Sequence, residues 1–192
     1  MQSLLLFGVA VAAMGCTWAA DRAIKSPPRP IEPTIMIRPA TAGDVPRMVE
    51  LSAMKRAQYE SYSPTFWHPA RDANQKQEAF FRGLVADPSW ICLVNETGGS
   101  VDGFIAARVV WAPPVYDPGG KVCMIDDFVV AHPSLWPTVG MALRDQAESK
   151  ASQAGAVISV TVCGQRDAPK RTALQNSDSH VASEWYVHPI AR

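Results

Sequence analysis

Two adjacent acids and a small-residue helix start are the residues of this sequence best suited to chemistry. Asp126 and Asp127 lie within an apolar run that is typical of a strand. Thr138 can cap a helix that follows, with Gly140 and Ala142 in its first turns. The free N–H groups and the positive dipole end of such a helix bind phosphate. An aspartate beside it could accept a proton, so the pattern indicates a phosphate-bearing cofactor that meets a substrate about to lose a proton.

Plainer explanations compete with this interpretation. Two acids can simply interrupt a strand and be satisfied by backbone or arginine, and a glycine at a helix start often only allows close packing. Buried carboxylates are costly unless paired, however, so we expect at least one of Asp126 and Asp127 in the site. Side chains alternate along a strand, so one should face the cleft and the other a structural partner. Lys170 and Arg171 could meet a cofactor's phosphates, although a solvated basic pair is the ordinary expectation.

The composition favours one ordinary globular domain. The 192 residues are enough for a buried core, and 47% of them are hydrophobic, as in a typical folded protein. A formal net charge of zero provides no basic field, so we expect no nucleic-acid partner. No histidine spacing matches a metal site, which predicts no metal. The cysteines form no C-x-x-C pair and three of them lie in apolar runs, so we expect free thiols rather than a disulfide framework.

Residues 1–34 differ from the rest of the chain. Leu4–Trp18 is apolar but short for a membrane span, and it resembles the middle of a secretory signal without the usual positive residues. Gly15 and Cys16 weakly resemble a lipoprotein site, a proline-rich linker follows, and Met36 could also be the true start. We expect an apolar leader and linker over 1–34, either signal-like or a mis-assigned start. We expect the folded part in the cytoplasm, with export or lipoprotein anchoring left open.

The remaining chain alternates strand and helix patterns. Apolar runs predict strands, and apolar residues at helical spacing predict helices. The strands are expected at Ile35–Arg38, Trp90–Val94, Val101–Trp111, Lys121–Val130, Ala156–Cys163 and Trp185–Ile190. The helices are expected from Thr41 or Asp44 to about Gln58 and over Gln75–Val85, Thr138–Ala154 and Asp167–Leu174. A helix joins Lys121–Val130 to Ala156–Cys163, so these strands should be parallel neighbours, the second of them buried, and the rest of the sheet antiparallel.

This order, with the strand IDDFVV, the helix start Gly140-x-Ala142 and the opening MIRPATAGD, resembles the GNAT acetyltransferase superfamily. The resemblance covers Ile35–Ile190 and implies one GNAT-like acetyltransferase domain over 35–192. Its fold class is α+β, an α/β three-layer sandwich. A mixed, mostly antiparallel sheet is flanked by helices and has one parallel β-α-β crossover and splayed central strands. The loop departs from the family pattern, because Pro137 stands where an Arg or Gln is usual.

The resemblance also implies acetyl-CoA as co-substrate, bound between the two splayed strands, and no metal. The backbone at the end of the first of these strands would bind the pantetheine arm and polarise the thioester carbonyl, at Phe128, Val129 and Val130. The first turns of the following helix would cradle the diphosphate, at Thr138, Val139, Gly140, Met141 and Ala142. A proline in that loop has no N–H to donate.

Catalysis in such a protein would be direct transfer, in which a substrate amine attacks the thioester and a general base takes its proton. Asp126 matches the acidic position that the family uses for this step, and Asp127 would orient the substrate or the structure. Many members protonate the leaving thiolate with a tyrosine on the helix after the second splayed strand. The matching helix, Pro169–Gln175, contains none, and Tyr186 further along could substitute.

The first hypothesis is therefore an acyl-CoA-dependent N-acetyltransferase that moves an acetyl group from acetyl-CoA to a primary amine of a small molecule. The alternative is a non-catalytic GNAT-like module that binds an acyl-CoA or a protein partner, which Pro137 and the missing tyrosine favour. A third hypothesis, an exported or membrane-tethered binding domain, rests only on the apolar leader. We expect a small-molecule amine as partner, no nucleic acid and no membrane for the folded domain, and we leave a homodimer open.

Overall fold

A computed structural model of the chain describes residues 35–190. The leader and linker expected over 1–34 lie outside the described residues. Within the described part the elements follow one another as β1 (Ile37–Pro39), α1 (Val45–Tyr62), α2 (Ala73–Ala86), β2 (Trp90–Thr97), β3 (Ser100–Val110), β4 (Lys121–Val130), the 3₁₀ turn η1 (Pro133–Leu135), the π-helical turn η2 (Trp136–Gly140), α3 (Met141–Gln153), β5 (Ala156–Thr161) and α4 (Ala168–Gln175). Up to α4, this order of strands and helices is the one that the sequence predicts.

The strands form one sheet in the order β1-β2-β3-β4-β5. Neighbouring strands are antiparallel except β4 and β5, which are parallel and are joined through α3. The predicted mixed sheet with a parallel β-α-β crossover is therefore confirmed. The β2–β3 hairpin turns at Gly98 and Gly99, whose φ angles of 59° and 81° lie in the left-handed region that a two-residue hairpin turn requires and glycine adopts at little cost.

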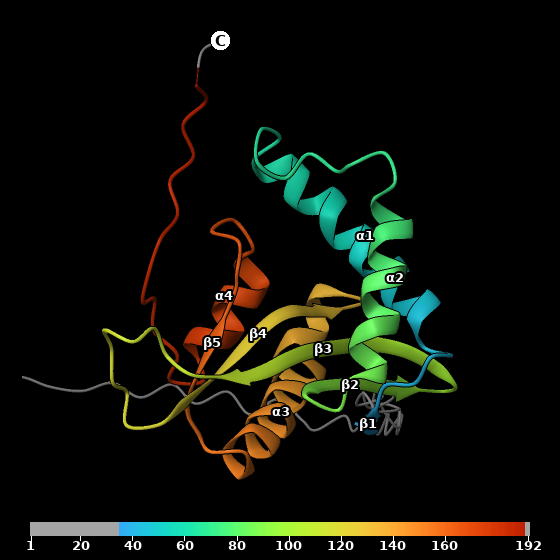
Figure 1. Ribbon diagram of the computed structural model, residues 1–192. Helices are drawn as coiled ribbons and strands as arrows, with labels where there is room; N and C mark the ends of the chain where they lie inside the picture. The colour runs from blue at the N-terminus through green and yellow to red at the C-terminus, as the bar shows by residue number, and fades with distance from the viewer. Residues whose placement is uncertain (1–34, 191–192) are drawn as a thin grey trace, which may run out of the picture. The chain divides into compact units, whose positions relative to one another are not determined.

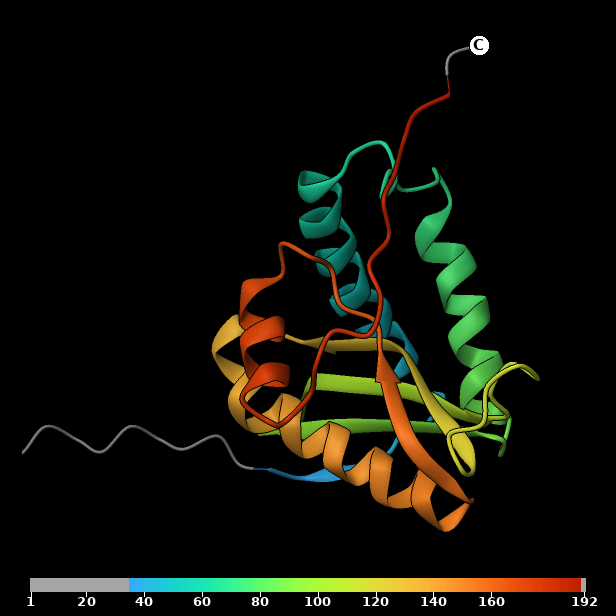
Figure 2. The same ribbon diagram turned by 90° about the vertical axis from the view of Figure 1, so that its left-hand side faces the viewer.

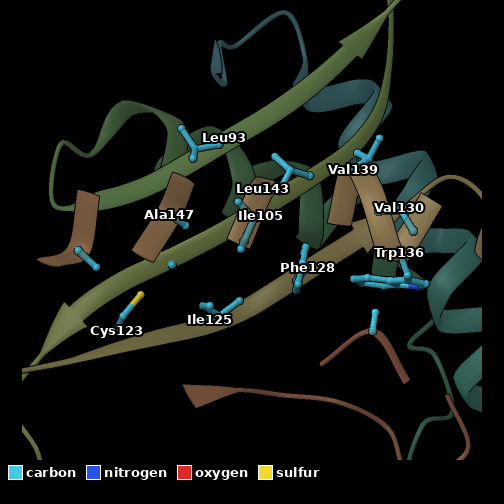
Figure 3. Close-up of a cluster of buried hydrophobic side chains, with 13 residues drawn as sticks. Leu93, Ile105, Cys123, Ile125, Phe128, Val130, Trp136, Val139, Leu143 and Ala147 are labelled. Atoms are coloured by element: carbon cyan, nitrogen blue, oxygen red, sulfur yellow. The ribbon is translucent and has the colours of Figure 1, made fainter. Parts of the chain in front are cut away.

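Helices cover both faces of the sheet (Figures 1 and 2). On one face α1 and α2 pack over β2 and β3, and the rings of Phe81 and Phe104 lie 5.4 Å apart. On the other face α3 packs with Leu143 and Ala147 against Ile105 and its neighbours, the buried cluster drawn in Figure 3. Burying a leucine, isoleucine or phenylalanine side chain in this way contributes about 1.5–3 kcal/mol. These two clusters are the inner surfaces of the predicted three-layer sandwich.

The strands β4 and β5 separate partway along β4. Their pairing ends at Ile125 of β4 and Thr161 of β5. At this point β4 has a β-bulge against β3, because Asp126 is an extra residue between the paired Ile125 and Asp127. A bulge bends its strand, so the second half of β4 diverges from β5. The predicted splay of the two central strands is confirmed.

The helix that follows β4 begins earlier than predicted. The turns η1 and η2 run directly into α3, so helical backbone begins at Pro133 and not at Thr138. The N–H of Met141 donates to the carbonyl oxygen of Trp136, which closes the wide π turn. Pro133 and Pro137 both lie where a helical turn leaves the missing N–H unused. The predicted helix start at Thr138 is therefore wrong.

The C-terminal part of the described chain departs most from the prediction. The strand β5 was expected to be buried, yet Val157, Ile158 and Val160 are exposed by 39–53%. The reason is position, because β5 is the edge of the sheet and, within residues 35–190, no strand lies beyond it. The expected strand Trp185–Ile190 is also wrong, since residues 179–190 contain neither helix nor strand. A strand pattern in sequence forms a strand only where it has a partner.

An ion-pair network holds the start of α1. Asp44 lies at the N-cap as expected, but its carboxylate accepts hydrogen bonds from Arg38 and Thr41 instead of from the helix amides. Arg38 also donates to Glu96 at 2.8 Å, so one guanidinium joins β1, α1 and β2. The hydrogen bond from Arg38 holds the pKa of Asp44 well below its usual range.

Candidate active site

The β-bulge gives the two aspartates different surroundings. Asp126 is exposed, whereas Asp127 is half-buried. Because side chains alternate along a strand, Asp127 shares the α1 side of the sheet with Val129, which packs in the cluster under α1 and α2. The positive charges that act on Asp127 belong to Lys170 of α4 and Arg56 of α1. Asp127 is therefore the member of the pair that faces the interior.

Burial is the main cause of the unusual proton affinity of Asp127. It raises the pKa of this carboxyl to about 6, with a smaller contribution from the charge of Asp126, while Lys170 and Arg56 act in the opposite direction. A carboxyl with such a pKa is still ionised at pH 7 for the most part, and it holds a proton more firmly than an ordinary aspartate. Those are the properties of a general base that works near neutral pH.

Lys170 bridges the two strands where they separate. Its side chain is buried, with 2% exposed. Its Nζ donates to the carbonyl oxygen of Phe128 on β4 at 3.2 Å and to that of Val162 after β5 at 2.8 Å. Burial lowers the pKa of Lys170 to about 8. The ordinary expectation of a solvated pair with Arg171 is therefore wrong for Lys170, whose ammonium group is a ready proton donor inside the gap between the strands.

A second buried ion pair fixes the position of α4. Asp167, directly before α4, is 1% exposed and pairs with Lys55 of α1. The hydroxyl of Tyr59 donates to the Asp167 carboxylate at 3.1 Å and accepts from the N–H of Gly164 at 3.0 Å. A buried carboxylate is stable only with such partners. These contacts tie α1 to the turn between β5 and α4, and thereby set where Lys170 lies.

Trp136 fills the space next to Lys170. Its indole is 3% exposed, packs edge-on against Phe128 at 4.8 Å, and lies beside Phe128 and Val130 in Figure 3. The ammonium group of Lys170 is 5.2 Å from an indole ring centroid and that of Lys55 is 5.6 Å away, so the ring meets two cations. The indole also covers Gly140, where a Cβ would lie 2.6 Å from its Cε3 atom.

The residues expected to bind acetyl-CoA lie along one continuous path from the end of β4 into α3. The strand end is buried at Phe128, Val129 and Val130. The helical part has Val139 and Gly140 buried, Met141 and Ala142 half-buried, and Thr138 exposed. The N–H of Met141 is used by the π turn, and the hydroxyl of Thr138 bonds the Leu135 carbonyl oxygen at 3.5 Å. The end of β4 has no strand partner on the side that faces β5, so it fits a pantetheine arm better than the helical turn fits a diphosphate.

Tyr186 lies apart from this arrangement along the chain. It is 89% exposed in the segment after α4, and its hydroxyl donates to Glu184 at 2.7 Å. That bond raises the pKa of Tyr186. The structure therefore gives Tyr186 a surface partner within its own segment.

A hollow of about 500 Å³ lies between α1 and the segment that leads into α2. It is lined by Arg56, Ala53, Ala57 and Glu60 of α1 and by residues 69–75. Because the charge of Arg56 acts on Asp127, this is a part of the surface where a small molecule would lie close to the charged cluster.

Over 35–190, His, Cys, Asp and Glu side chains do not gather in groups of three that could hold a metal ion. In the same range, none of the helices has the length and apolar character needed to cross a bilayer. The cysteines of this part, Cys92, Cys123 and Cys163, are free thiols.

Comparison with known proteins identifies a fold. No protein-family model matches the chain, and no curated protein matches it. Among solved structures, a mutant of the BH1408 protein of Bacillus halodurans has a TM-score of 0.71 at 12% identity and covers 82% of this chain and 100% of its own. A predicted acetyltransferase of Clostridium acetobutylicum, solved with acetyl-CoA, has a TM-score of 0.62 at 15% identity and covers 81% and 96%.

A GCN5-related N-acetyltransferase of Ralstonia eutropha has a TM-score of 0.58 at 19% identity and covers 82% of this chain and 99% of its own. Similarities at these identities show the fold, and they agree with the strand order, the crossover and the splay described above. The chain therefore has the GNAT acetyltransferase fold.

Sequence analysis missed the burial of Lys170 and the residues that surround it. Lys170 stands next to Arg171 in a short polar helix, and nothing in its immediate neighbours predicts burial. Lys55, Asp167 and Trp136 come from three different elements, so only the fold brings them together. A weak signal was available, because Gly140 follows Trp136 at a spacing of four residues, which in a helix places a position without a side chain under the indole ring.

Proposed function

We propose that this chain is an N-acetyltransferase that moves an acetyl group from acetyl-CoA to a primary amine of a small molecule. The observation that carries this proposal is Asp127, a half-buried carboxyl with a pKa of about 6, placed at the β-bulge where β4 and β5 of a GNAT fold separate. Acetyl-CoA is a cytosolic metabolite, so the proposal includes a cytoplasmic location.

The base in this proposal is Asp127 instead of Asp126, which the sequence favoured. An amine is protonated near pH 7 and must lose a proton before its nitrogen can attack. The Asp127 carboxylate takes that proton, and the nitrogen bonds to the thioester carbonyl carbon. As the C–S bond breaks, the nitrogen releases its second proton to water and a neutral amide results. Asp126, exposed on the bulge, would meet solvent or the substrate's outer part.

The leaving thiolate needs a proton, and Lys170 is the group in the described residues best placed to give one. Its ammonium lies between the carbonyl oxygens of Phe128 and Val162, at the strand end where a thioester would lie. With a pKa of about 8, it matches a thiol, whose ordinary pKa is about 8.5. Lys170 would thus take the role expected of a tyrosine, and Tyr186 would not be needed.

The test has two parts, binding and turnover. Coenzyme A should raise the melting temperature of the protein, because a ligand that binds only the folded state stabilises it. Thiol release from acetyl-CoA should then require an amine from a panel of small primary amines. Absence of both effects at millimolar coenzyme A would overturn the proposal.

A second candidate, a non-catalytic module, is favoured by a specific observation. Lys170 and Trp136 already fill the gap between the strands, and the π turn uses the N–H of Met141 that a diphosphate would need. In such a module, coenzyme A would stabilise the protein without any amine-dependent thiol release, or a protein partner would bind instead. The turnover measurement with the amine panel separates the two candidates.

A further inference from the structure

The hollow between α1 and the segment that leads into α2 has the size of a small-molecule site. One wall is a single face of α1, because its residues recur at helical spacing, namely Ala53, Arg56, Ala57 and Glu60. Residues 69–75 form the other wall, at the end of the loop that joins α1 to α2 in the upper part of Figure 2. The volume of about 500 Å³ lies within the range of ligand pockets, so the hollow suits a small molecule.

Arg56 is the residue at which this hollow meets the surroundings of Asp127. It follows the buried Ser52 by four positions and precedes the buried Tyr59 by three, so it lies at the border of the buried face of α1. On its other side it lines the hollow. Its charge acts on Asp127. One side chain therefore connects the hollow with the proposed base.

Arg56 and Asp127 carry opposite charges that are not paired in the structure. Both side chains are half-buried, and within the described residues neither forms an ion pair. Arg56 donates only to the uncharged amide oxygen of Asn74, and Asp127 accepts no hydrogen bond in the same part of the chain. Burial lowers the pKa of Arg56, as expected for a cation taken partly out of water. Charges in this situation are costly until a partner or a ligand neutralises them.

The acids that line the hollow already have partners, whereas its arginines have no carboxylate. Glu60 accepts a hydrogen bond from Nδ1 of His68 at 2.8 Å, and Asp72 pairs with Lys76 at 3.0 Å. Arg71, the second arginine of the lining, has neither a hydrogen bond nor an ion pair within the part of the chain that the structure describes. The groups that remain for a ligand are therefore guanidiniums, whose planar set of N–H donors matches a carboxylate.

We propose that the acceptor amine also carries a carboxylate, as an amino acid does, and that this carboxylate binds Arg56 in the hollow while the amino group meets Asp127. Such a zwitterion supplies both of the charges that the two side chains lack. Acetylation removes the positive charge of the amine, so the product loses its attraction to Asp127 and is released more easily. The assignment of this amine as acceptor rests on the proposed acetyl transfer, whereas the binding of a carboxylate at Arg56 does not.

Pairs of substrates that differ in the charge of the carboxylate test the proposal. Thiol release from acetyl-CoA is measured with glycine and β-alanine, and with their amides, in which an uncharged group of the same shape replaces the carboxylate. The measured quantity is the ratio of kcat/KM for each amino acid to kcat/KM for its amide. Loss of the Arg56 charge also affects Asp127, but that effect acts on both substrates and cancels in the ratio.

The variant Arg56→Gln should lower this ratio by about 10- to 100-fold, the range expected for a hydrogen bond between two charged groups. Arg56→Lys keeps the charge and should keep most of the preference. Arg71→Gln should lower the ratio by a smaller factor, and it provides a second test should Arg56→Gln fail to fold. Arg82→Gln is the matched control, because Arg82 lies outside the hollow and pairs with Glu78 within α2, and its ratio should equal that of the wild type.

Calorimetric titration of glycine and β-alanine in the presence of coenzyme A separates this inference from the proposed function. An Arg56→Gln variant that turns over with the wild-type ratio overturns the inference and leaves the acetyltransferase standing. Amino acids that bind in an Arg56-dependent manner without thiol release refute acetyl transfer and keep the carboxylate site. Absence of both turnover and Arg56-dependent binding overturns both.

Discussion

The pKa values of Asp127 and Lys170 are shifted by the same cause, which is burial of a charge. Folding places an acid and a base within one charged cluster, where burial raises the pKa of Asp127 to about 6 and lowers that of Lys170 to about 8. Each shift makes the charged form less favourable and its neutralisation easier. Both groups can therefore change protonation near neutral pH, whereas an ordinary aspartate or lysine cannot.

The first prediction separates the two aspartates. Replacing Asp127 by asparagine keeps the side-chain shape but removes the proton acceptor, so kcat/KM for the amine should fall by about 10²–10⁴-fold. Asp126→Asn changes the neighbouring, exposed acid in the same way and should leave the rate within a few-fold of wild type. Thiol release measures both, and the affinity for coenzyme A should not change in either. A large loss in Asp126→Asn with a normal Asp127→Asn would restore the assignment that the sequence favoured.

The second prediction concerns the pH dependence of the rate. With Asp127 as base and Lys170 as acid, kcat should rise with pH through about 6 and fall above about 8. Lys170→Arg keeps a cation in the gap, but arginine does not release its proton in this range. Its rate should be at least tenfold lower and should show no decline between pH 8 and 9. If the alkaline decline persisted unchanged in the variant, Lys170 would have a purely structural role.

At this scale the sequence indicated the place but not the roles. The adjacent acids, the strand around them and the small residues that follow pointed to the region in which the structure places the shifted pKa values of Asp127 and Lys170. The sequence could not show which of the two acids faces inward. That depends on the extra residue at the β-bulge, and the bulge exists only where β4 pairs with β3. The sequence also could not show that Lys170 is buried. A lysine in a polar helix is buried only when other elements supply carbonyl oxygens and a charged partner.

Elements position these groups through close packing around Trp136. The π turn η2 places the indole against Phe128 of β4 and over Gly140, so the helix and the strand end share one filled space. A π turn adds a residue relative to the regular α-helix and commonly lies at functional sites. Here it allows the chain to enter α3 with Pro137 in the turn and Val139 in the core.

The third prediction tests this packing with two glycines. In Gly140→Ala the new Cβ would lie 2.6 Å from the buried ring of Trp136, which has no room to move, so unfolding should become easier by about 1–3 kcal/mol. Gly83→Ala, in α2, adds a Cβ that meets nothing within 4 Å and should stabilise the protein by about 0.5–1 kcal/mol. Urea unfolding measures both. Equal effects of the two changes would show that Trp136 adapts freely.

Patterns of hydrophobicity were sufficient to predict the helices and strands that pack against a neighbouring element. The strand Lys121–Val130 was predicted with the bounds that the structure gives. Gly155 follows the end of α3 with a φ of 90°, as expected for a glycine that stops a helix. The same patterns failed at both ends of the crossover. Two prolines moved the helix start towards Pro133, and the apolar run at β5 was taken as buried because periodicity does not show that a strand is at an edge.

Two carboxylates, Asp44 and Asp127, change the free energy of unfolding in opposite directions as the pH changes. Arg38 holds the pKa of Asp44 well below its usual range, so this ion pair stabilises the fold above the ordinary pKa of an aspartate, about 4, and is lost as the pH falls through and below that value. Asp127 has a raised pKa, so its ionisation destabilises the fold. That cost is present above pH 6 and disappears as the pH falls from about 6 to about 4.

The fourth prediction follows from these two signs. The free energy of unfolding should rise as the pH is lowered from 7, reach a maximum between about pH 4 and 5, and fall at lower pH. Asp127→Asn should abolish the rise between pH 7 and 5 and be more stable than wild type at pH 7, by at most about 3 kcal/mol for a pKa moved from 3.8 to about 6. Asp44→Asn should instead be less stable at pH 7, and its free energy of unfolding should fall much less than that of the wild type at low pH.

Urea unfolding across pH 3–8 measures the profile for the wild type and the two variants. The comparison is informative because Asp127 and Asp44 lie in different parts of the molecule, one at the β4 bulge and the other at the start of α1, so their effects should add. A stability that rises without interruption from pH 4 to pH 7 would mean that Asp127 carries no cost of burial. It would then lack the raised proton affinity on which its proposed role as base depends, and the acetyltransferase proposal would lose its main support.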